Sequence, residues 1–220
     1  MFGVIPKTAW SRRYPSDKQN GCILAMRSML VRDGNGKIVL VDNGAGNKHL
    51  KQLGYYNFFD LVDLKEELRR RDVACVTDVI LTHLHFDHCG YTTQKEEQPG
   101  EKSLFKMAFP NAIHWVGRAQ WENFLHPNAL EADSYFIENM QVAYDSGKLR
   151  LIENDTNLCP GIDLRLFDGH TPGQIAPYIT TPERTYVFAG DVIPLAASVS
   201  PLWISAYDTY PVVSKNEKMR

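Results

Sequence analysis

Three histidines and an aspartate lie within six consecutive positions of this chain, directly after an apolar stretch. The segment reads ILTHLHFDHCG over residues 80–90, and its polar side chains are His83, His85, Asp87 and His88. Imidazoles two residues apart on extended backbone can point to the same side, and the carboxylate and third imidazole add further donors nearby. Nitrogen and carboxylate oxygen without thiolate suit zinc, iron or manganese better than calcium. The spacing therefore predicts a metal site, and four donors leave room for two ions.

Two later motifs offer further ligands. His170 stands in FDGHTPGQ (167–174), at the end of an expected strand, and Asp191 stands in VFAGDVIP (187–194), after a glycine at another strand end. Open sites tend to form where such strand ends meet, so both residues are candidates to complete the metal site. The remaining histidines are expected to be ordinary surface or core residues: His49, His114 and His126.

The elements that would position these motifs are strands and helices in a mixed order. Two apolar runs, 22–31 and 38–42, flank a Gly- and Asn-rich turn and predict a β-hairpin. Residues 76–82 (VTDVILT) predict a strand buried on both faces, with the histidine turn at its carboxyl end. Other strands are expected at 112–116, 149–152, 162–167, 175–181 and 185–190, helices at 61–71, 118–125 and 133–144, and an exposed polar loop at 91–103. The pattern indicates an α+β chain with one mixed sheet or two sheets.

Composition and charge restrict the class of protein. The 220 residues are 44% hydrophobic with a net charge of -2, which predicts a single domain over 1–220 with a sizeable core. Balanced charge gives no general attraction to nucleic acid or anionic lipid, and no apolar run approaches membrane-spanning length. The chain start lacks the order of a secretory signal, and the four cysteines are scattered. We therefore expect a soluble, cytoplasmic protein with free thiols, and neither nucleic acid nor membrane as a partner.

The ordered motifs resemble the metallo-β-lactamase superfamily. THLHFDH, GHTPG and AGD follow one another as the family's H-x-H-x-D-H, later His and later Asp do, and VLVDNGAG resembles its early VDTG segment. The resemblance covers about residues 22–195 and implies a four-layer αββα sandwich, with two mixed sheets face to face and helices outside. It also implies a ligand set: His83, His85 and His170 on a first metal ion, Asp87 and His88 on a second, and Asp191 bridging the two.

One part of the family's pattern is not found in these residues. The family has a further histidine on the second metal, well downstream of the bridging aspartate, whereas residues 192–220 contain none. We therefore expect the sequence to lack its C-terminal end, and also a first strand before Met1. The second metal site of this chain is accordingly expected to be weak, partly occupied or completed by water.

The resemblance implies an enzyme, namely a hydrolase that depends on two divalent ions, most readily zinc. Two such ions lower the pKa of a bridging water towards neutrality, and the resulting hydroxide attacks a carbonyl carbon or phosphorus. Asp87 is the candidate catalytic residue, as a proton shuttle. The segment HLHFDHCG, with Phe86, resembles lactonase-like members that open acyl-homoserine lactones, and Phe86 is a candidate residue of the substrate pocket. The predicted substrate is therefore a small molecule with an ester or lactone bond.

Other functions and other roles for the aromatic residues stay open. A glyoxalase II-type thioester hydrolase would use the same ligands, and a non-enzymatic binding module could use the metals only to stabilise its fold. Trp203 and Tyr207, near an apolar loop at 193–205, could line an acyl-chain pocket, as could the YYNFF cluster at 55–59. The same aromatics could instead pack in the core or in the contact of a homodimer.

Residues beside the predicted ligands could orient them. Asp168 and Thr171 flank His170 and are candidates to hydrogen-bond its ring. Cys89, beside His88, is either a thiol next to the metal or a small buried apolar residue.

Overall fold

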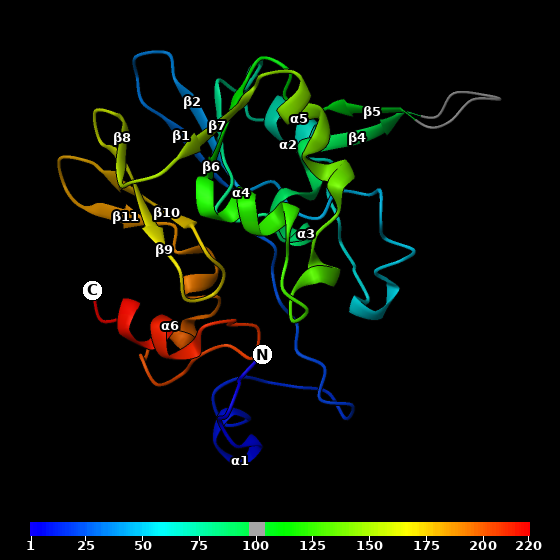
Figure 1. Cartoon of the computed structure of the whole chain (residues 1–220), viewed down its shortest axis with the longest axis vertical. Helices are drawn as coiled ribbons and strands as arrows, with labels where there is room; N and C mark the ends of the chain where they lie inside the picture. Colours follow the sequence, from blue (N-terminus) through cyan, green and yellow to red (C-terminus); the bar gives the residue numbers. More distant parts are fainter. Residues whose placement is uncertain (97–103) are drawn as a thin grey trace. The chain divides into compact units, whose positions relative to one another are not determined.

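The computed structural model describes residues 1–96 and 104–220, and its strands and helices confirm the predicted α+β class (Figure 1). The chain divides into two compact units, each assembled from segments distant in the sequence. Unit 1 comprises residues 1–25, 117–131 and 153–220, and unit 2 comprises 26–116 and 132–152. That residues 1–220 act as one domain stays a prediction.

Unit 2 is built on a sheet with the strand order β1-β2-β3-β6-β7. β1 (Met29–Arg32) and β2 (Ile38–Val41) are antiparallel, which confirms the predicted hairpin in a shorter form. The register pairs Met29 with Val41, where β2 ends, so the strand predicted over residues 22–31 begins only at Met29. The other strands of the unit are β3 (Asp78–Ile80), β6 (Ile113–Gly117) and β7 (Leu149–Ile152), and a separate antiparallel pair, β4 (Thr93–Glu96) and β5 (Leu104–Met107).

β3 lies between β2 and β6, parallel to both, and all three of its residues are at most 3% exposed, as its apolar run predicts. The carboxylate of Asp78 in this strand accepts hydrogen bonds from Lys37 Nζ at 2.8 Å and Trp115 Nε1 at 2.9 Å, so its buried charge is paired. Because β2 and β3 are parallel, the segments that follow them, from Asp42 and from Leu81, leave the same edge of the sheet.

The helices of unit 2 are short. α2 (Leu64–Arg69) confirms the helix predicted at 61–71, although it begins later and ends earlier than predicted. The Asp63 side chain caps this helix by accepting a hydrogen bond from Glu66 N at 3.0 Å. The other helices of the unit before residue 97 are η1 (Gly54–Tyr56), α3 (Phe86–Cys89) and η2 (Gly90–Thr92).

The single helix predicted at 133–144 is wrong. The segment forms three short turns instead, because Phe136 has extended backbone and its ring stacks on His49 with the centroids 4.1 Å apart. Packing of this aromatic side chain therefore overrides the helical pattern of the sequence. The three turns are η3 (Ala132–Ser134), η4 (Ile137–Asn139) and α5 (Gln141–Asp145).

The loop predicted at 91–103 is wrong for residues 91–96, and residues 97–103 lie outside the described part of the chain. β4 pairs with β5 in a register that runs from Thr93 opposite Met107 to Glu96 opposite Leu104. A strand in a two-stranded ribbon does not need the apolar run by which a buried strand is identified. The polar composition of this segment therefore indicates a loop, although the segment forms β4.

His114, on β6, is the buried histidine of this sheet. It is 0% exposed, and neither ring nitrogen has a hydrogen-bond partner among residues 1–96 and 104–220. Burial lowers the pKa of its imidazole from 6.5 to about 4, because the charged ring would be desolvated. His114 is therefore a core residue, as expected.

We expect His114→Leu to remove part of the acid sensitivity of folding. Above pH 6.5 the ring is neutral in both states; between pH 6.5 and about 4 the unfolded chain binds a proton that the folded chain does not, so stability falls. At ~1.4 kcal/mol per pKa unit, the wild type should lose about 3 kcal/mol more than the variant over this interval. Urea unfolding of both proteins at a series of pH values measures the difference. If the unfolding free energies of the two proteins changed equally with pH, the lowered pKa of His114 would be contradicted. His126→Leu, at an exposed position, is the control.

Unit 1 is built on an antiparallel sheet with the strand order β11-β10-β9-β8. β9 (Ile162–Phe167) and β10 (Gln174–Thr180) pair from Phe167 opposite Gln174, so the intervening residues 168–173 form the loop that carries His170. Phe167, Ala176 and Val192 form a buried cluster behind that loop. β8 (Thr156–Cys159), which the sequence did not indicate, and β11 (Thr185–Val187) complete the sheet.

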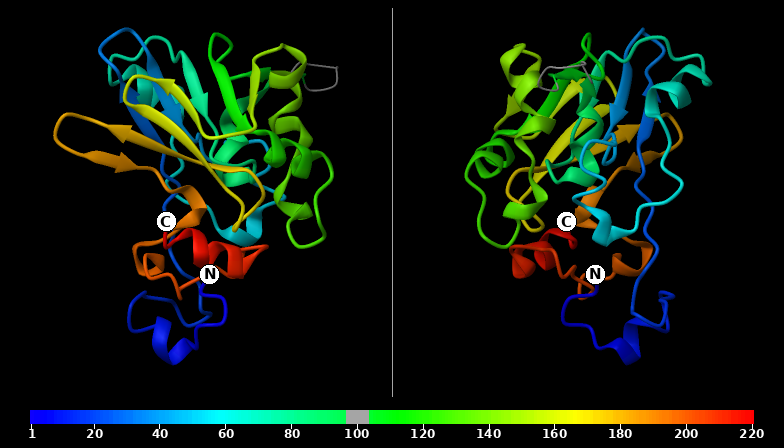
Figure 2. Two further views of the ribbon diagram at one scale, coloured as in Figure 1. Left: turned by 60° about the vertical axis from the view of Figure 1, so that its left-hand side comes forward. Right: turned by 90° about the vertical axis from the view of Figure 1, so that its right-hand side faces the viewer.

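The helical elements of unit 1 include one that the sequence predicts residue for residue, α4 (Arg118–Leu125). The N-terminal segment lies beside the segment at 195–206 in both views of Figure 2, where Ala206 N donates to Met1 O at 2.9 Å. Among the described residues, no helix has both the length and the apolar character needed to cross a bilayer. The remaining helices are α1 (Lys7–Trp10), η5 (Gly190–Val192), η6 (Ala196–Ser198) and α6 (Pro211–Glu217).

Candidate metal centre

The predicted ligands are divided between the two units. Unit 2 carries the histidine-turn group, which is His83, His85, Asp87 and His88, and unit 1 carries the His170 group, which is His170 and Asp191. The histidine turn follows β3 and runs into α3, so that the first two imidazoles lie on extended backbone and the last two ligands on one helical turn. His83 and His85 are 0% and 7% exposed.

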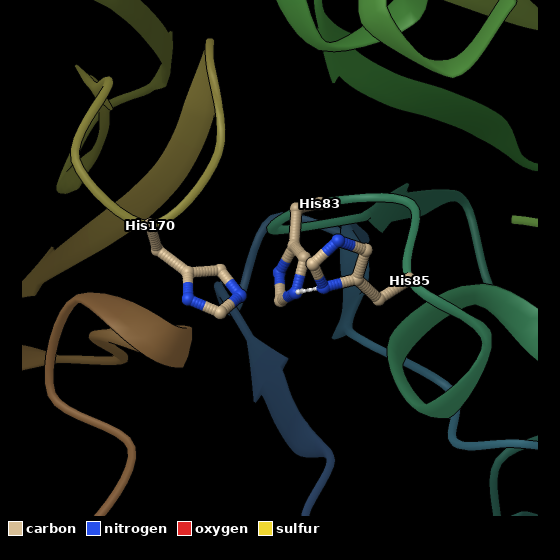
Figure 3. A group of neighbouring side chains, drawn as sticks. All are labelled: His83, His85 and His170. Atoms are coloured by element: carbon tan, nitrogen blue, oxygen red, sulfur yellow. Dashed lines mark hydrogen bonds between the residues drawn. The ribbon is translucent and has the colours of Figure 1, made fainter. Parts of the chain in front are cut away.

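The rings of His83 and His85 are in contact and nearly perpendicular, with an angle of 80° between their planes. Nε2 of His83 lies 3.0 Å from Nδ1 of His85 (Figure 3). Nδ1 of His83 lies 3.1 Å from the Thr82 hydroxyl, which itself donates to a carboxylate, so the hydroxyl oxygen accepts a hydrogen bond from this ring nitrogen. His83 therefore carries its proton on Nδ1 and its lone pair on Nε2, the nitrogen turned to His85.

Asp42, which sequence reasoning did not assign to the site, organises this group. Its carboxylate accepts hydrogen bonds from Thr82 N at 2.7 Å, from Thr82 Oγ1 at 2.8 Å and from His88 Nδ1 at 2.7 Å. Burial raises the pKa of the Asp42 carboxyl, and the charge and hydrogen bond of His88 oppose that shift. One carboxylate thus fixes the orientation of His88 directly and that of His83 through Thr82.

The VDNGAG segment was the signal for Asp42, because its aspartate ends β2 at the same sheet edge as the histidine turn. The backbone of Asp42 is left-handed, with φ 52°, a conformation that Asp tolerates better than most side chains. This bend directs the following residues across the turn, where Asn43 N donates to His88 O at 2.9 Å.

The segment 43–48 lies against the end of α3 at backbone contact. A Cβ placed on Gly90 would lie 2.2 Å from Ala45 O, so only glycine fits there. The ammonium of Lys48 donates to the carbonyl oxygens of Gly90 and Thr93, and burial lowers its pKa to about 8. The turn that bears the ligands is therefore held by a second segment of the same unit.

In unit 1, as in unit 2, a carboxylate lies beside a ring nitrogen of a histidine that is predicted to bind metal. The Nε2 atom of His170 lies 3.5 Å from Asp191 Oδ2, and its Nδ1 lies 3.1 Å from Asp208 Oδ1. The side chains of His170 and Asp208 are each 1% exposed, and that of Asp191 is 25% exposed. Asp191, a residue predicted for the site, lies beside His170. The sequence contained no signal for Asp208, which lies 38 residues downstream of the histidine.

The two residues expected to orient His170 act on its loop. Asp168 Oδ1 accepts a hydrogen bond from Gly173 N at 2.8 Å, which closes the loop between β9 and β10. The Thr171 hydroxyl accepts from Gln120 Nε2 at 2.9 Å and from Asn123 Nδ2 at 3.2 Å, both on α4. The carboxylate at the ring itself is that of Asp208.

The donor groups have the chemistry that a divalent ion such as zinc requires. His83, His88 and His170 each present Nδ1 to an oxygen atom, which leaves the lone pair on Nε2. Asp87 and Asp191 add carboxylate oxygens: Asp87 Oδ2 lies 3.6 Å from Nε2 of His88, and its side chain is 37% exposed. Imidazole lone pairs beside carboxylates fit a zinc-type ion.

A cavity of about 450 Å³ lies in unit 2 close to His85. Tyr135 lines it, and the Tyr135 and His85 rings are 5.0 Å apart between centroids. Tyr56 and Phe136 also line it, and both contact Phe86, which is 6% exposed. The remaining lining residues are Gln52, Leu53, Ala132 and Asp133.

The other residues predicted for a pocket lie in unit 1. Trp203 packs edge-on against Phe2 at 6.2 Å, and the guanidinium of Arg13 lies 4.6 Å from its ring centroid. Tyr207 is 52% exposed. Their contribution to a substrate pocket stays a prediction. Cys89 is fully buried and its pKa is raised by burial to about 12, so it is the small buried residue of the two alternatives.

Comparisons with known proteins agree with the fold and the motifs. The sequence pattern of the metallo-beta-lactamase superfamily matches residues 27–91, and no curated protein sequence matches the chain. The structure of a probable metal-dependent hydrolase from Staphylococcus aureus is 32% identical, with a TM-score of 0.88 over 100% of this chain and 77% of that protein.

Two more distant structures show the same fold. The hydrolase AbOPH is 20% identical, with a TM-score of 0.73 over 98% of this chain and 74% of its own. The dizinc quorum-quenching lactonase AidC is also 20% identical, with a TM-score of 0.66 over 86% of this chain and 65% of its own. The predicted αββα fold class is confirmed, and the chain belongs to the metallo-β-lactamase superfamily.

Proposed function

We propose that this protein is a hydrolase whose two donor groups together hold a pair of divalent ions, most suitably zinc. The observation that carries the proposal is a hydrogen-bond pattern common to His83, His88 and His170. Each ring directs Nδ1 at an oxygen atom, which leaves its lone pair on Nε2. In the proposed assignment His83, His85 and His170, the side chains drawn in Figure 3, would hold the first ion. Asp87 and His88 would hold the second, and Asp191 would contribute to both.

The metals and the side chains have separate tasks in this proposal. Two bound divalent ions supply a nucleophile at neutral pH and polarise the bond to be broken. Asp87 is the carboxylate of the histidine turn, and its side chain is 37% exposed, so it can accept a proton during the reaction and return it to the leaving group. Asp42 holds His88 and, through Thr82, His83.

We propose an ester or lactone as the substrate, with an apolar group beside the reacting carbonyl. The cavity near His85 supports this, because Tyr56, Tyr135 and Phe136 give it aromatic walls next to a proposed ligand. AidC and other structures similar in fold are acyl-homoserine lactone lactonases, which makes such lactones the first compounds to test. Phe86 would support the cavity from behind, and Trp203 and Tyr207 are further candidates to contact the substrate.

Metal removal separates the proposed enzyme from a module that metal merely stabilises. We expect chelation to abolish turnover of a reactive lactone or ester while most of the circular-dichroism signal is retained, because extensive sheet hydrogen bonds and a buried core do not involve the donors. Zinc should restore the rate. Loss of the fold together with the metal, and no turnover of lactone, thioester or phosphodiester by the zinc-loaded protein, would contradict the proposal. Faster thioester than lactone turnover would favour the glyoxalase II-type alternative.

A further inference from the structure

The loop that carries His170 is held by the segment that follows the Asp191 motif. Glu217, at the end of α6, accepts a hydrogen bond from Asp168 N at 2.7 Å through one carboxylate oxygen and from Gly169 N at 2.8 Å through the other. Thr209 donates to His170 O twice, from N at 3.0 Å and from Oγ1 at 2.9 Å. The backbone of the loop is thus fixed on both sides of the histidine.

The backbone of α6 lies close to this loop. A Cβ added to Gly169 would lie 2.4 Å from both N and Cα of Ser214, so the helix backbone occupies the space that any other residue would need. Tyr210, which precedes the helix, donates from its backbone N to Gly169 O at 2.9 Å. The position of Gly169, and with it the start of the His170 side chain, is set by this segment.

Asp208 in the same segment controls the ring. Its Oδ1 lies 3.1 Å from His170 Nδ1, and its Oδ2 accepts a hydrogen bond from Ser205 N at 3.1 Å. Since the Ser205 amide can only donate, it fixes which way the carboxyl group faces and keeps an acceptor oxygen directed at the ring. A neutral imidazole beside such an acceptor carries its proton on Nδ1 and presents a lone pair on Nε2.

We propose that Asp208 is a positioning residue that selects the Nδ1-protonated tautomer of His170, while Glu217 fixes the loop on which the ring is mounted. The importance of this selection for activity rests on the proposed function, because only the lone pair on Nε2 can bind an ion on the Asp191 side of the ring. The tautomer itself can be measured without metal and without substrate.

Asp208→Asn is the decisive variant because it preserves shape and reverses one donor. Ser205 N requires the amide oxygen of the new side chain, so the amide NH₂ must face the imidazole and donate to Nδ1. The ring proton should then move to Nε2. We expect nitrogen-15 NMR of the metal-free protein to show His170 protonated on Nδ1 in the wild type and on Nε2 in the variant.

Zinc affinity supplies a second readout, by competition with a chromophoric chelator. We expect Asp208→Asn to bind zinc about 10 to 100 times more weakly than the wild type, as for other groups that hydrogen-bond a ligand. Glu217→Gln is the matched control: it should lower thermal stability through its weakened loop contacts and keep the wild-type tautomer. A role of Asp208 in stability alone would lower the melting temperature and leave the tautomer unchanged.

The outcomes keep the two proposals apart. A wild-type His170 protonated on Nε2, which requires no variant to fold, would overturn the role of Asp208, as would an Asp208→Asn protein with wild-type tautomer and zinc affinity. If the wild type bound no zinc while Asp208→Asn changed the tautomer as expected, the proposed hydrolase would be overturned and the positioning role would stand.

Discussion

The His85→Ala variant is expected to lose metal-dependent hydrolysis by about a thousandfold or more, which corresponds to about 4 kcal/mol of transition-state stabilisation. The ring is 7% exposed, and its Nδ1 lies 3.0 Å from Nε2 of His83, so alanine removes a donor that no neighbouring side chain of the turn can replace. His170→Ala should have the same effect, because it removes the only imidazole of the His170 group. Steady-state kinetics on a lactone or ester, with metal content measured for each protein, tests both variants.

His126→Ala is the control for these variants, since this histidine is exposed and belongs to neither donor group. It should keep wild-type turnover and metal content. Undiminished turnover by metal-loaded His85→Ala or His170→Ala would show that the assigned residues are not the site, whatever the fold. Loss of activity in the His126→Ala protein would show instead that the assay reports general damage.

Gly90→Ala is expected to destabilise the folded protein by about 3 kcal/mol, as overpacking against an immobile neighbour does. The new Cβ would lie 2.2 Å from Ala45 O and 2.8 Å from Ala45 Cα, and these are backbone atoms that cannot rotate away. Relief requires the segment 43–48 to move off the end of α3. That movement would also disturb the hydrogen bond between Asn43 N and His88 O, so metal affinity should fall together with stability.

Gly54→Ala provides the comparison, because among the described residues, apart from the two chain neighbours, no heavy atom lies within 4 Å of a Cβ at that position. Its free energy of unfolding should stay within about 0.5 kcal/mol of the wild type. Urea unfolding of all three proteins measures the contrast. Equal stability of Gly90→Ala and Gly54→Ala would mean that the two segments do not meet as closely as the structure has them.

Local pattern in the sequence identified the elements that carry the donors. The strand before the histidine turn and the helix at 118–125 were predicted because the order of apolar and polar residues in each segment is typical of the structure that it forms. The helix at 133–144 failed because its periodicity is interrupted by one aromatic packing contact, between Phe136 and His49, which lie 87 positions apart. Such a contact leaves no trace in a short window of sequence.

Separation along the sequence also explains which residues of the candidate site were predicted and which were not. The histidine turn is a cluster in the chain itself, and the motifs around His170 and Asp191 repeat a known order. Asp42 and Asp208 were not assigned, because they meet their histidines across 46 and 38 positions of the chain. Only the VDNGAG segment gave a local signal for Asp42, and Asp208 had none. Residues that orient the predicted ligands are identified only in the folded structure, whereas the predicted ligands themselves can be recognised in the sequence by their residue type and spacing.

The hydrogen bonds of Asp42 to Thr82 and His88 lie wholly inside unit 2 and are formed during folding of that unit. The rotational freedom of two imidazoles is therefore lost when the chain folds and not again when a cation arrives. Ion capture at this turn should be fast and should show a small entropic penalty in calorimetry. A mutant lacking the Asp42 carboxylate would instead have to order these rings at the moment of capture.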